Sequence, residues 1–449
     1  MKNKLRIILL LLLLCPQIHL SGQNTLATLA DMHSVVKGET WESVAAHYGV
    51  SVAELQAANP DVKRKKLKKK TLLIIPKAHA PLASEGKEPS LPAGQIELTP
   101  LIRTSIPNLK VGVLLPFGQP KMVEFYRGFL MAADSVRRQG VNLDIHAWDC
   151  GTTTAQLEPL LPGLSGLDVI FGPPSPTQIH VLAETCREQG TRLVLPFWSG
   201  QALQDYPLVY NATAPDAVCC DAAVRKLLSY YADRNFVIVH SGNADNIGRT
   251  LTEVLGQHVT QRAVVSRVLE LEGDDFAYES ALNQFRDNMI VIDDSSVRSL
   301  NILLARLKEF RQKHPDYRLT LVGYSSWQDE TQRLLGDFFA FDTHVISPYY
   351  YNVFDERTKL FQRTYEKAFR TTIAQDNPRL AAMGFDLGYY FMSGISSLGD
   401  TFEQMQGSLR QESYQNRYQF ERNATGMSFT NSFIQFIHFT PENKIELIR

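Results

Sequence analysis

Polar and aromatic side chains follow most of the apolar runs in the second part of the chain, and their types could support ligand chemistry. Hydroxyl, amide and aromatic groups dominate among them: Phe117, Gly118, Gln119, Asp149, Pro174, Ser175, Thr177, Trp198, Ser199, Ser241, Asn243, Asp293, Ser295, Tyr324, Ser325, Trp327 and residues 349–351. Such groups hold a ligand by hydrogen bonds and by contact with its apolar surface. The set therefore favours reversible binding over bond breaking.

The sequence lacks the motifs that would support catalysis. It contains no P-loop, no GxSxG elbow and no HExxH zinc motif. Neither an HxH pair nor a closely spaced Cys/His set suggests a metal or an activated thiol. Asp293 and Asp294 resemble paired acids but follow a single apolar run, and His146, His180 and His240 read as polar edges or satisfied core groups. We therefore expect no enzyme activity and no cofactor.

Alternating strands and helices must position the candidate residues. The run "LKVGVLLPF" predicts a buried strand, and an amphipathic helix follows over residues 123–140. Further strands are predicted at 141–149, 167–175, 191–200, 234–243, 288–296, 318–327 and 343–352. This order predicts an α/β body with two lobes, each a doubly wound parallel sheet. Ligands of such sheets bind beyond the carboxyl ends of the strands, where the candidate residues stand.

Four short motifs give the body a family resemblance: residues 111–116 (VGVLLP), 170–173 (IFGP), 195–197 (LPF) and 384–386 (GFD). With these motifs, residues 109–449 resemble the type I periplasmic binding proteins, particularly the receptors for branched-chain amino acids. The resemblance implies that Ser175, Thr177 and Ser199 hold a ligand carboxylate and that Asp386 is the acid of a late helix. The first loop departs from the family, because Phe117, Gly118 and Gln119 replace its hydroxyl-bearing turn.

An earlier segment, residues 33–77, predicts a small module of strand, helix, helix and strand. Thr40 can cap the first helix, and Ser51 with Glu54 forms a capping box for the second. Residues 72–76 (LLIIP) predict the closing strand.

The segment resembles a LysM domain through residues 33–40 (HSVVKGET), 44–55 (VAAHYGVSVAEL), 58–60 (ANP) and 74–76 (IIP). The resemblance implies binding of N-acetylglucosamine-containing glycans, above all peptidoglycan, in a groove between two loops. The implied groove residues are Gly38, Glu39, Thr40, Trp41, Asn59, Pro60, Asp61 and Val62. Trp41 stands where the family usually has an aliphatic residue, which leaves open whether its ring is core or a sugar platform.

The same segment ends with a basic run that has seven Lys or Arg among residues 63–70. The whole chain has 46 Lys plus Arg against 47 Asp plus Glu, so we expect no nucleic-acid partner. Residues 33–77 hold nine basic and four acidic residues, a balance of +5. This charge either assists binding to an anionic wall polymer or only keeps a strand edge solvated.

The N-terminus predicts export from the cytoplasm. A basic head precedes an apolar block at residues 7–14, and residues 1–22 read as a signal peptide. Cys15 follows Leu14, whereas a lipobox has a small residue at that point, so lipidation is not expected. We expect a wall-associated periplasmic protein.

The remaining features concern the linker and the thiols. Residues 78–107 are rich in Pro, Ala, Ser and Glu and predict a tether. Cys150, Cys186, Cys219 and Cys220 are too sparse for a disulfide scaffold, which leaves buried thiols or one incidental bridge.

The combination of modules predicts a non-catalytic cell-envelope protein. It is similar to envelope proteins of the Bacteroidota, and a similar body serves as an interaction platform in lipoprotein activators of peptidoglycan synthases. We expect a platform for another envelope protein. The alternative is a receptor for an amino acid, a muropeptide or another small solute.

Overall fold

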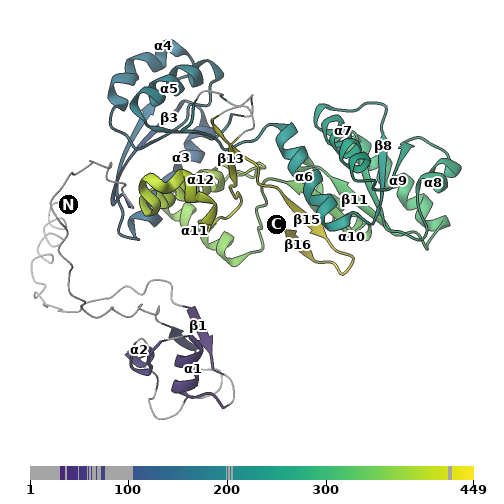
Figure 1. Ribbon diagram of the computed structural model, residues 1–449, viewed down its shortest axis with the longest axis horizontal. Helices are drawn as coiled ribbons and strands as arrows, with labels where there is room; N and C mark the ends of the chain where they lie inside the picture. The colour runs from purple at the N-terminus through teal and green to yellow at the C-terminus, as the bar shows by residue number, and fades with distance from the viewer. Residues whose placement is uncertain are drawn as a thin grey trace, which may run out of the picture. The chain divides into compact units, whose positions relative to one another are not determined.

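The computed structural model describes residues 31–35, 38–48, 50–57, 59, 62, 67, 72–75, 105–198, 200, 203, 206–422 and 427–449. The chain divides into two compact units, Met1–Glu97 and Leu98–Arg449 (Figure 1). The division falls inside the predicted linker, residues 78–107. The predicted signal peptide, residues 1–22, lies outside the described residues.

The first unit has the predicted order of strand, helix, helix and strand. Its elements are β1 (Asp31–Ser34), α1 (Trp41–Tyr48), α2 (Val52–Ala57) and β2 (Leu72–Ile75), and the two strands pair antiparallel. Both predicted caps are present. The Ser43 amide donates to Thr40 Oγ1 over 3.3 Å at the start of α1, and the Glu54 amide donates to Ser51 Oγ over 3.2 Å at the start of α2.

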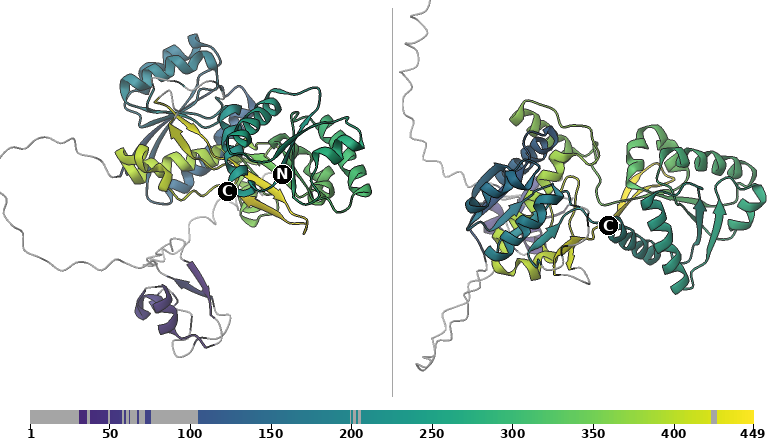
Figure 2. Two further views of the ribbon diagram at one scale, coloured as in Figure 1. Left: turned by 45° about the vertical axis from the view of Figure 1, so that its right-hand side comes forward. Right: turned by 90° about the horizontal axis from the view of Figure 1, so that it is seen from above.

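The second unit contains two seven-stranded sheets, one in each lobe (Figure 2). The first sheet has the order β13-β14-β7-β6-β5-β3-β4. Its strands are β3 (Asn108–Leu115), β4 (Asn142–Asp149), β5 (Val169–Phe171), β6 (Arg192–Leu195), β7 (Val209–Asn211), β13 (Phe420–Arg422) and β14 (Phe429–Asn431). The helices of this lobe are α3 (Pro120–Arg137), α4 (Thr154–Leu157), α5 (Pro176–Gln189), α11 (Glu356–Phe369), α12 (Leu380–Leu398) and α13 (Phe402–Met405).

The second sheet has the order β16-β15-β12-β11-β10-β8-β9. Its strands are β8 (Asn235–His240), β9 (Ser266–Glu270), β10 (Asn288–Ile292), β11 (Leu319–Gly323), β12 (Thr343–Ser347), β15 (Gln435–Phe439) and β16 (Ile445–Ile448). The helices of this lobe are α6 (Asp216–Tyr231), α7 (Asn246–Gln261), α8 (Asp275–Ala281), α9 (Val297–Lys313) and α10 (Thr331–Ala340). The two-lobed α/β architecture confirms the predicted fold class.

The chain does not complete one lobe before it begins the other. The chain leaves the first lobe after β7, returns after β12 to form α11, α12, β13 and β14, and leaves again to form β15 and β16. The strands β13, β15 and β16 pair antiparallel with a neighbour, so both sheets are mixed. The chain passes from one lobe to the other directly after β7 and after β12. The carboxyl ends of the parallel strands in both sheets therefore face the connection between the lobes.

Helices α3 and α12 pack on each other at glycines in the core of the first lobe. A Cβ added at Gly128 would lie 1.8 Å from the carbonyl oxygen of Ala381, and one at Gly384 would lie 2.0 Å from that of Phe125. Both distances are far below van der Waals contact. The atoms that the added Cβ would meet belong to the backbone of the facing helix, which cannot move aside as a side chain can. The glycines therefore set how closely the two helices approach.

We expect Gly128→Ala to lower the stability of the body. The added methyl group forces the two helices apart, and overpacking of this kind costs about 1–3 kcal/mol, occasionally more. Gly256→Ala is the matched control, because Gly256 lies inside α7 with no atom within 4 Å of an added Cβ. There alanine should be neutral or raise stability by up to about 1 kcal/mol. Urea denaturation measures both, and equal midpoints for the two variants would contradict the close helix contact.

Candidate functional site

A hollow opens at the carboxyl edge of the first-lobe sheet. It has a volume of about 560 Å³ and is lined by Pro116, Gly118, Gln119, Asp149, Gly151, Thr152 and Gln156. These residues follow β3 and β4, where the sequence placed three of them. Asp149 is the one charged residue of the lining, and its Oδ1 accepts a hydrogen bond of 3.1 Å from the Gly151 amide. The hollow is thus polar and has one negative group.

Ser175 and Thr177, predicted to hold a ligand carboxylate, lie beside this hollow at the start of α5. The Ser175 hydroxyl donates to the carbonyl of Thr152 over 2.9 Å, and its oxygen lies 3.1 Å from Thr177 Oγ1. Because Ser175 gives its hydrogen to Thr152, Thr177 is the donor to Ser175. Both hydroxyl hydrogens are then used inside the protein. The pair ties α5 to the loop after β4. Ser199, the third predicted residue, lies outside the described residues.

The carboxyl edge of the second-lobe sheet carries an Asp–His pair. Asp293 follows β10 and is buried, and its Oδ2 lies 2.9 Å from Nδ1 of His240, the last residue of β8. Its Oδ1 accepts from the Ser241 amide over 2.8 Å. Burial raises the pKa of Asp293, but the hydrogen bonds from Ser241 and His240 outweigh burial and hold it below its usual range. Asp293 is therefore a charged group that fixes the two strand ends.

Two neighbouring carboxylates on this edge also accept hydrogen bonds from groups of their own lobe. Asp294 accepts from the hydroxyls of Ser296 and Ser299 over 3.0 and 2.6 Å. Asp245 accepts from the amide and hydroxyl of Ser295 over 3.1 and 2.5 Å. The aromatic candidates Tyr324 and Trp327 are buried in the core. Ser241, Asp293 and Ser295 thus lie at one edge, where they bond to neighbouring protein groups, whereas Tyr351 of the predicted residues 349–351 packs in the core of the first lobe.

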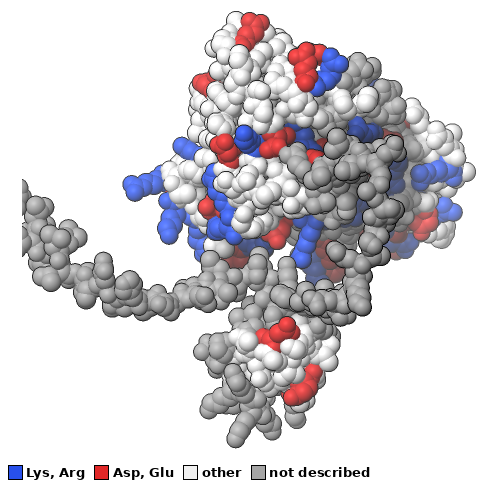
Figure 3. Space-filling view, turned by 60° about the vertical axis from the view of Figure 1, so that its left-hand side comes forward, with Lys and Arg blue, Asp and Glu red and all other residues white. Residues whose placement is uncertain are grey.

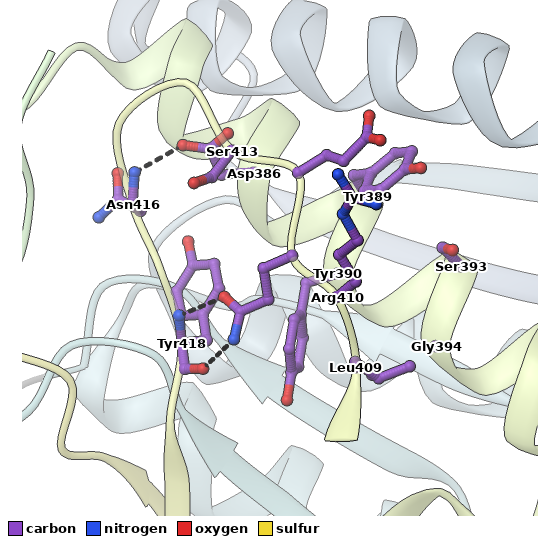
Figure 4. A pocket seen from close by; sticks show the side chains of 12 residues that line it. Asp386, Tyr389, Tyr390, Ser393, Gly394, Leu409, Arg410, Ser413, Asn416 and Tyr418 are labelled. Atoms are coloured by element: carbon purple, nitrogen blue, oxygen red, sulfur yellow. Dashed lines mark hydrogen bonds between the residues drawn. The ribbon is translucent and has the colours of Figure 1, made fainter. Parts of the chain in front are cut away.

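Asp386, the predicted late-helix acid, holds a loop of its own lobe. It lies in α12 and is 2% exposed. Its carboxylate accepts from the backbone amides of Tyr414, Gln415 and Asn416 over 2.7, 2.8 and 2.6 Å, and Figure 4 shows the bond from Asn416. Burial raises its pKa to about 7, and the three amides oppose that rise.

Asp386 also lines a separate small cavity of about 20 Å³, which has room for about one water molecule. The other lining residues are Tyr389, Tyr390, Ser393, Gly394, Leu409, Arg410, Gln411, Glu412, Ser413, Asn416 and Tyr418 (Figure 4). This cavity shares no lining residue with the hollow at Asp149. The structure therefore does not bring Asp386 into that hollow.

One cluster of metal-ligand types occurs in the described part of the chain, at Asp342, His344 and His438. His438 Nε2 lies 2.6 Å from Asp342 Oδ1, and His344 Nε2 lies 2.9 Å from the Tyr231 hydroxyl. The two imidazole rings stack at 3.9 Å, and Arg234 stands 4.0 Å from Asp342. Burial lowers the pKa of His344 to about 3. The nitrogen and oxygen atoms that could bind a metal already bond to protein groups, and the Arg234 guanidinium lies beside them. We therefore interpret the cluster as a structural hydrogen-bond network.

The thiols stay unpaired with each other. Cys150, Cys186, Cys219 and Cys220 are free, the first of the two alternatives that the sequence left open. Burial raises the pKa of Cys150 to about 11 and the pKa values of the other three to about 12. Such thiols are poor nucleophiles at neutral pH.

In the first unit, Trp41 belongs to the core. It is 4% exposed and packs with Val35, Val44, Ala45, Leu55, Leu67 and Leu73. Of the two alternatives for Trp41, the structure thus shows the core one, and the ring offers no surface on which a sugar could stack.

The other predicted groove residues divide into those on the surface and those used by the fold. Gly38 and Thr40 are exposed, Glu39 and Val62 are half-buried, and Gly38 has φ +102°, a conformation that glycine adopts without strain. The buried Asn59 side chain donates to the carbonyl of Leu55 over 2.7 Å. Pro60 and Asp61 lie outside the described residues, as does the basic run apart from the buried Leu67.

The family model of the LysM domain matches residues 33–76. The chain carries a LysM domain. The match coincides with the four motifs and ends one residue before the predicted boundary. No curated protein matches the sequence.

Solved structures show the fold of the body. A putative branched-chain amino acid ABC transporter protein from Rhodospirillum rubrum has a TM-score of 0.54 at 12% identity, and the match covers 76% of this chain and 100% of that one. Full-length LpoA from Haemophilus influenzae has a TM-score of 0.50 at 14% identity, over 78% of this chain and 60% of that one. The body has the fold of the type I periplasmic binding proteins, as the sequence predicted.

Two further findings concern the charged side chains on the surface and the length of the helices. Basic and acidic side chains both occur on the face of the body seen in Figure 3, and neither forms a continuous layer. Among the described residues, no helix has the length and apolar character needed to cross a membrane. Sequence reasoning missed Pro116, Gly151, Thr152 and Gln156 of the hollow, although the run Gly-Thr-Thr-Thr at residues 151–154, one residue after β4, was a signal for two of them.

Proposed function

We propose that this chain is a non-catalytic envelope protein that binds peptidoglycan through residues 33–76 and presents the two-lobed body as an interaction platform. The LysM match carries the proposal. The exposed Gly38 and Thr40 at the start of α1 supply one wall of the glycan groove. Residues 1–22 direct export to the periplasm, and the segment 78–107 tethers the body to the wall.

The body favours a platform over a receptor because its expected ligand groups bind each other. The hydroxyls of Ser175 and Thr177 are used inside the first lobe, and Asp293, Asp294 and Asp245 accept from their own lobe. A ligand carboxylate would have to displace the bonds of Ser175 and Thr177, and a hydrogen bond of this kind contributes about 0.5–1.5 kcal/mol. A protein partner can bind the outer surface and leave them in place.

The second candidate function is a solute receptor, and the hollow beside Asp149 favours it. A volume of about 560 Å³ at the carboxyl ends of β3 and β4 suits a small ligand in size and place. A receptor that closes on a metabolite gains stability from binding. A screen of amino acids and muropeptides by thermal shift separates the functions, because a rise in Tm supports the receptor and a flat response with a co-purifying envelope protein supports the platform.

We expect the body alone, residues 98–449, to lose binding to purified sacculi. The full mature chain should sediment with sacculi, since the LysM domain is the part that resembles a wall binder. The truncated chain should stay in the supernatant, with an unchanged Tm of the body as evidence that it is folded. Equal sedimentation of both proteins would contradict the proposed role of residues 33–76.

A further inference from the structure

Helix α11 has one face in the core of the first lobe and one face in solvent. Phe361 and Tyr365 stand four residues apart on the inner face and pack in the core. The outer face carries Leu360, Arg363 and Lys367, which follow one another at intervals of three and four residues. Leu360 is 58% exposed, so this leucine adds little to the core of the lobe.

Two further exposed apolar residues, Val353 and Phe354, directly precede the start of α11. Asp355 is the N-cap of the helix. An apolar residue just before the N-cap often packs against the fourth residue of the helix. In α11 that residue is Lys359, which pairs with Glu356 over 2.8 Å. The Phe354 ring therefore lacks this contact, and it is 76% exposed.

The cations that follow Leu360 on α11 have no counter-charge. Among the described residues, no carboxylate lies within ion-pair distance of the exposed Arg363, Lys367 or Arg370. The segment 353–370 contains five basic and three acidic residues. The three acids accept hydrogen bonds from their own segment: Asp355 from Thr358, Glu356 from Lys359 and Glu366 from Gln362. The outer face of α11 thus presents unpaired positive charge.

We propose that these residues form a docking surface for an acidic, amphipathic segment of a protein partner. The α11 surface consists of Val353, Phe354, Leu360, Arg363, Lys367 and Arg370. The inference deepens the platform function and rests on it. Protein interfaces are rich in aromatic anchors and in arginine, and the α11 surface offers both. Acidic side chains of the partner supply the counter-charges that the chain itself lacks.

The composition of the α11 surface favours a protein over a membrane. A helix that lies on a membrane buries a wide apolar face among the lipids. The apolar face of α11 is already used, because Phe361 and Tyr365 pack in the lobe. Leu360 is the one large apolar side chain on the outer face of the helix. Such a narrow apolar strip beside three cations suits a segment that has both leucines and acids.

A fluorescent peptide of 14 residues, the length of α11, tests the surface. The peptide carries leucines at helical spacing with glutamates on both sides, and a second peptide has lysines in place of the glutamates. The full mature chain should bind the acidic peptide and not the basic one in anisotropy titrations. Arg363→Glu/Lys367→Glu should raise the Kd about tenfold or more, because like charges then face each other.

Arg262→Glu/Arg298→Glu is the matched control for this double variant. It changes the net charge by the same amount at two exposed residues of the second lobe, and the Kd should stay that of the wild type. Equal Kd values for the two double variants would show that the peptide responds to net charge alone, which overturns the proposal. A wild type that binds no acidic peptide up to about 1 mM also overturns it.

Phe354→Ser tests the apolar part of the α11 surface. The variant should raise the Kd of the acidic peptide about tenfold and leave Tm unchanged, because the ring is exposed. Val268→Ser, at an exposed residue of β9 in the second lobe, should change neither quantity. A Phe354→Ser variant that binds as tightly as Val268→Ser would contradict the aromatic anchor.

Two further measurements separate the α11 surface from other occupants and from the platform function itself. Sedimentation of the wild type with phosphatidylglycerol vesicles, lost in Arg363→Glu/Lys367→Glu, would assign the surface to a membrane and overturn the protein partner. An envelope protein that co-purifies equally with the wild type and this variant would place docking elsewhere, while the platform function stands. A wild type without any envelope partner would contradict the platform function, on which the docking surface rests.

Discussion

Replacing Glu403 by alanine should cost about 3–5 kcal/mol of stability, the usual penalty for breaking a buried ion pair from one side. Glu403 in α13 holds Arg192 at the start of β6 through two bonds, Nε to Oε1 over 2.7 Å and Nη2 to Oε2 over 3.0 Å. The Tyr210 hydroxyl donates to the same Oε1 over 3.0 Å. The two charged side chains are 9% and 10% exposed, so the variant leaves a guanidinium without its counter-charge in the interior.

Urea denaturation followed by tryptophan fluorescence measures this loss. Asp134→Ala is the matched control, since Asp134 pairs with Arg138 on the surface and such pairs contribute about 0–1 kcal/mol. The double variant Arg192→Met/Glu403→Leu should recover much of the stability lost by Glu403→Ala, because neither charge is then buried alone. A Glu403→Ala loss no larger than the Asp134→Ala loss would show that water reaches the pair.

The sequence predicted the elements whose signals are local. The alternation of apolar runs and amphipathic helices predicted β3 to β6 and α3, and the capping box at Ser51 predicted the start of α2. These features depend on residues a few positions apart. The LysM motifs also lie within one short segment, so sequence alone identified the domain.

The parts that the sequence did not predict depend on contacts between distant residues. The chain returns to the first lobe at α11, and β14 enters the first sheet beside β7, with Phe429 paired to Tyr210. No local feature of the run "SFTN" predicts that β14 pairs with β7. Likewise the resemblance implied ligand contacts for Ser175 and Asp386, whereas their observed partners, Thr152 and the loop at 414–416, follow from tertiary packing.

Asp386→Ala should destabilise the body by several kcal/mol without any ligand present. The variant leaves the amides of Tyr414, Gln415 and Asn416 without their acceptor, and each buried donor left unpaired costs about 1–3 kcal/mol. Asp149→Ala is the matched control, because Asp149 is exposed and should change stability little. A variant as stable as the control would contradict the anchoring role. Ligand assays on Asp386 variants therefore need their stability measured first.

The pH dependence of that loss tests the burial of the carboxyl group. Burial raises the pKa of Asp386 to about 7, while an unfolded aspartate titrates near 3.9. Between these values the folded protein holds a proton that the unfolded chain has released. The contribution to stability is therefore complete below about pH 4 and declines as the pH rises through about 7. The stability difference between wild type and Asp386→Ala should shrink over this range in urea titrations. A difference that grows with pH would show that the three amides outweigh burial and hold the pKa below its ordinary value.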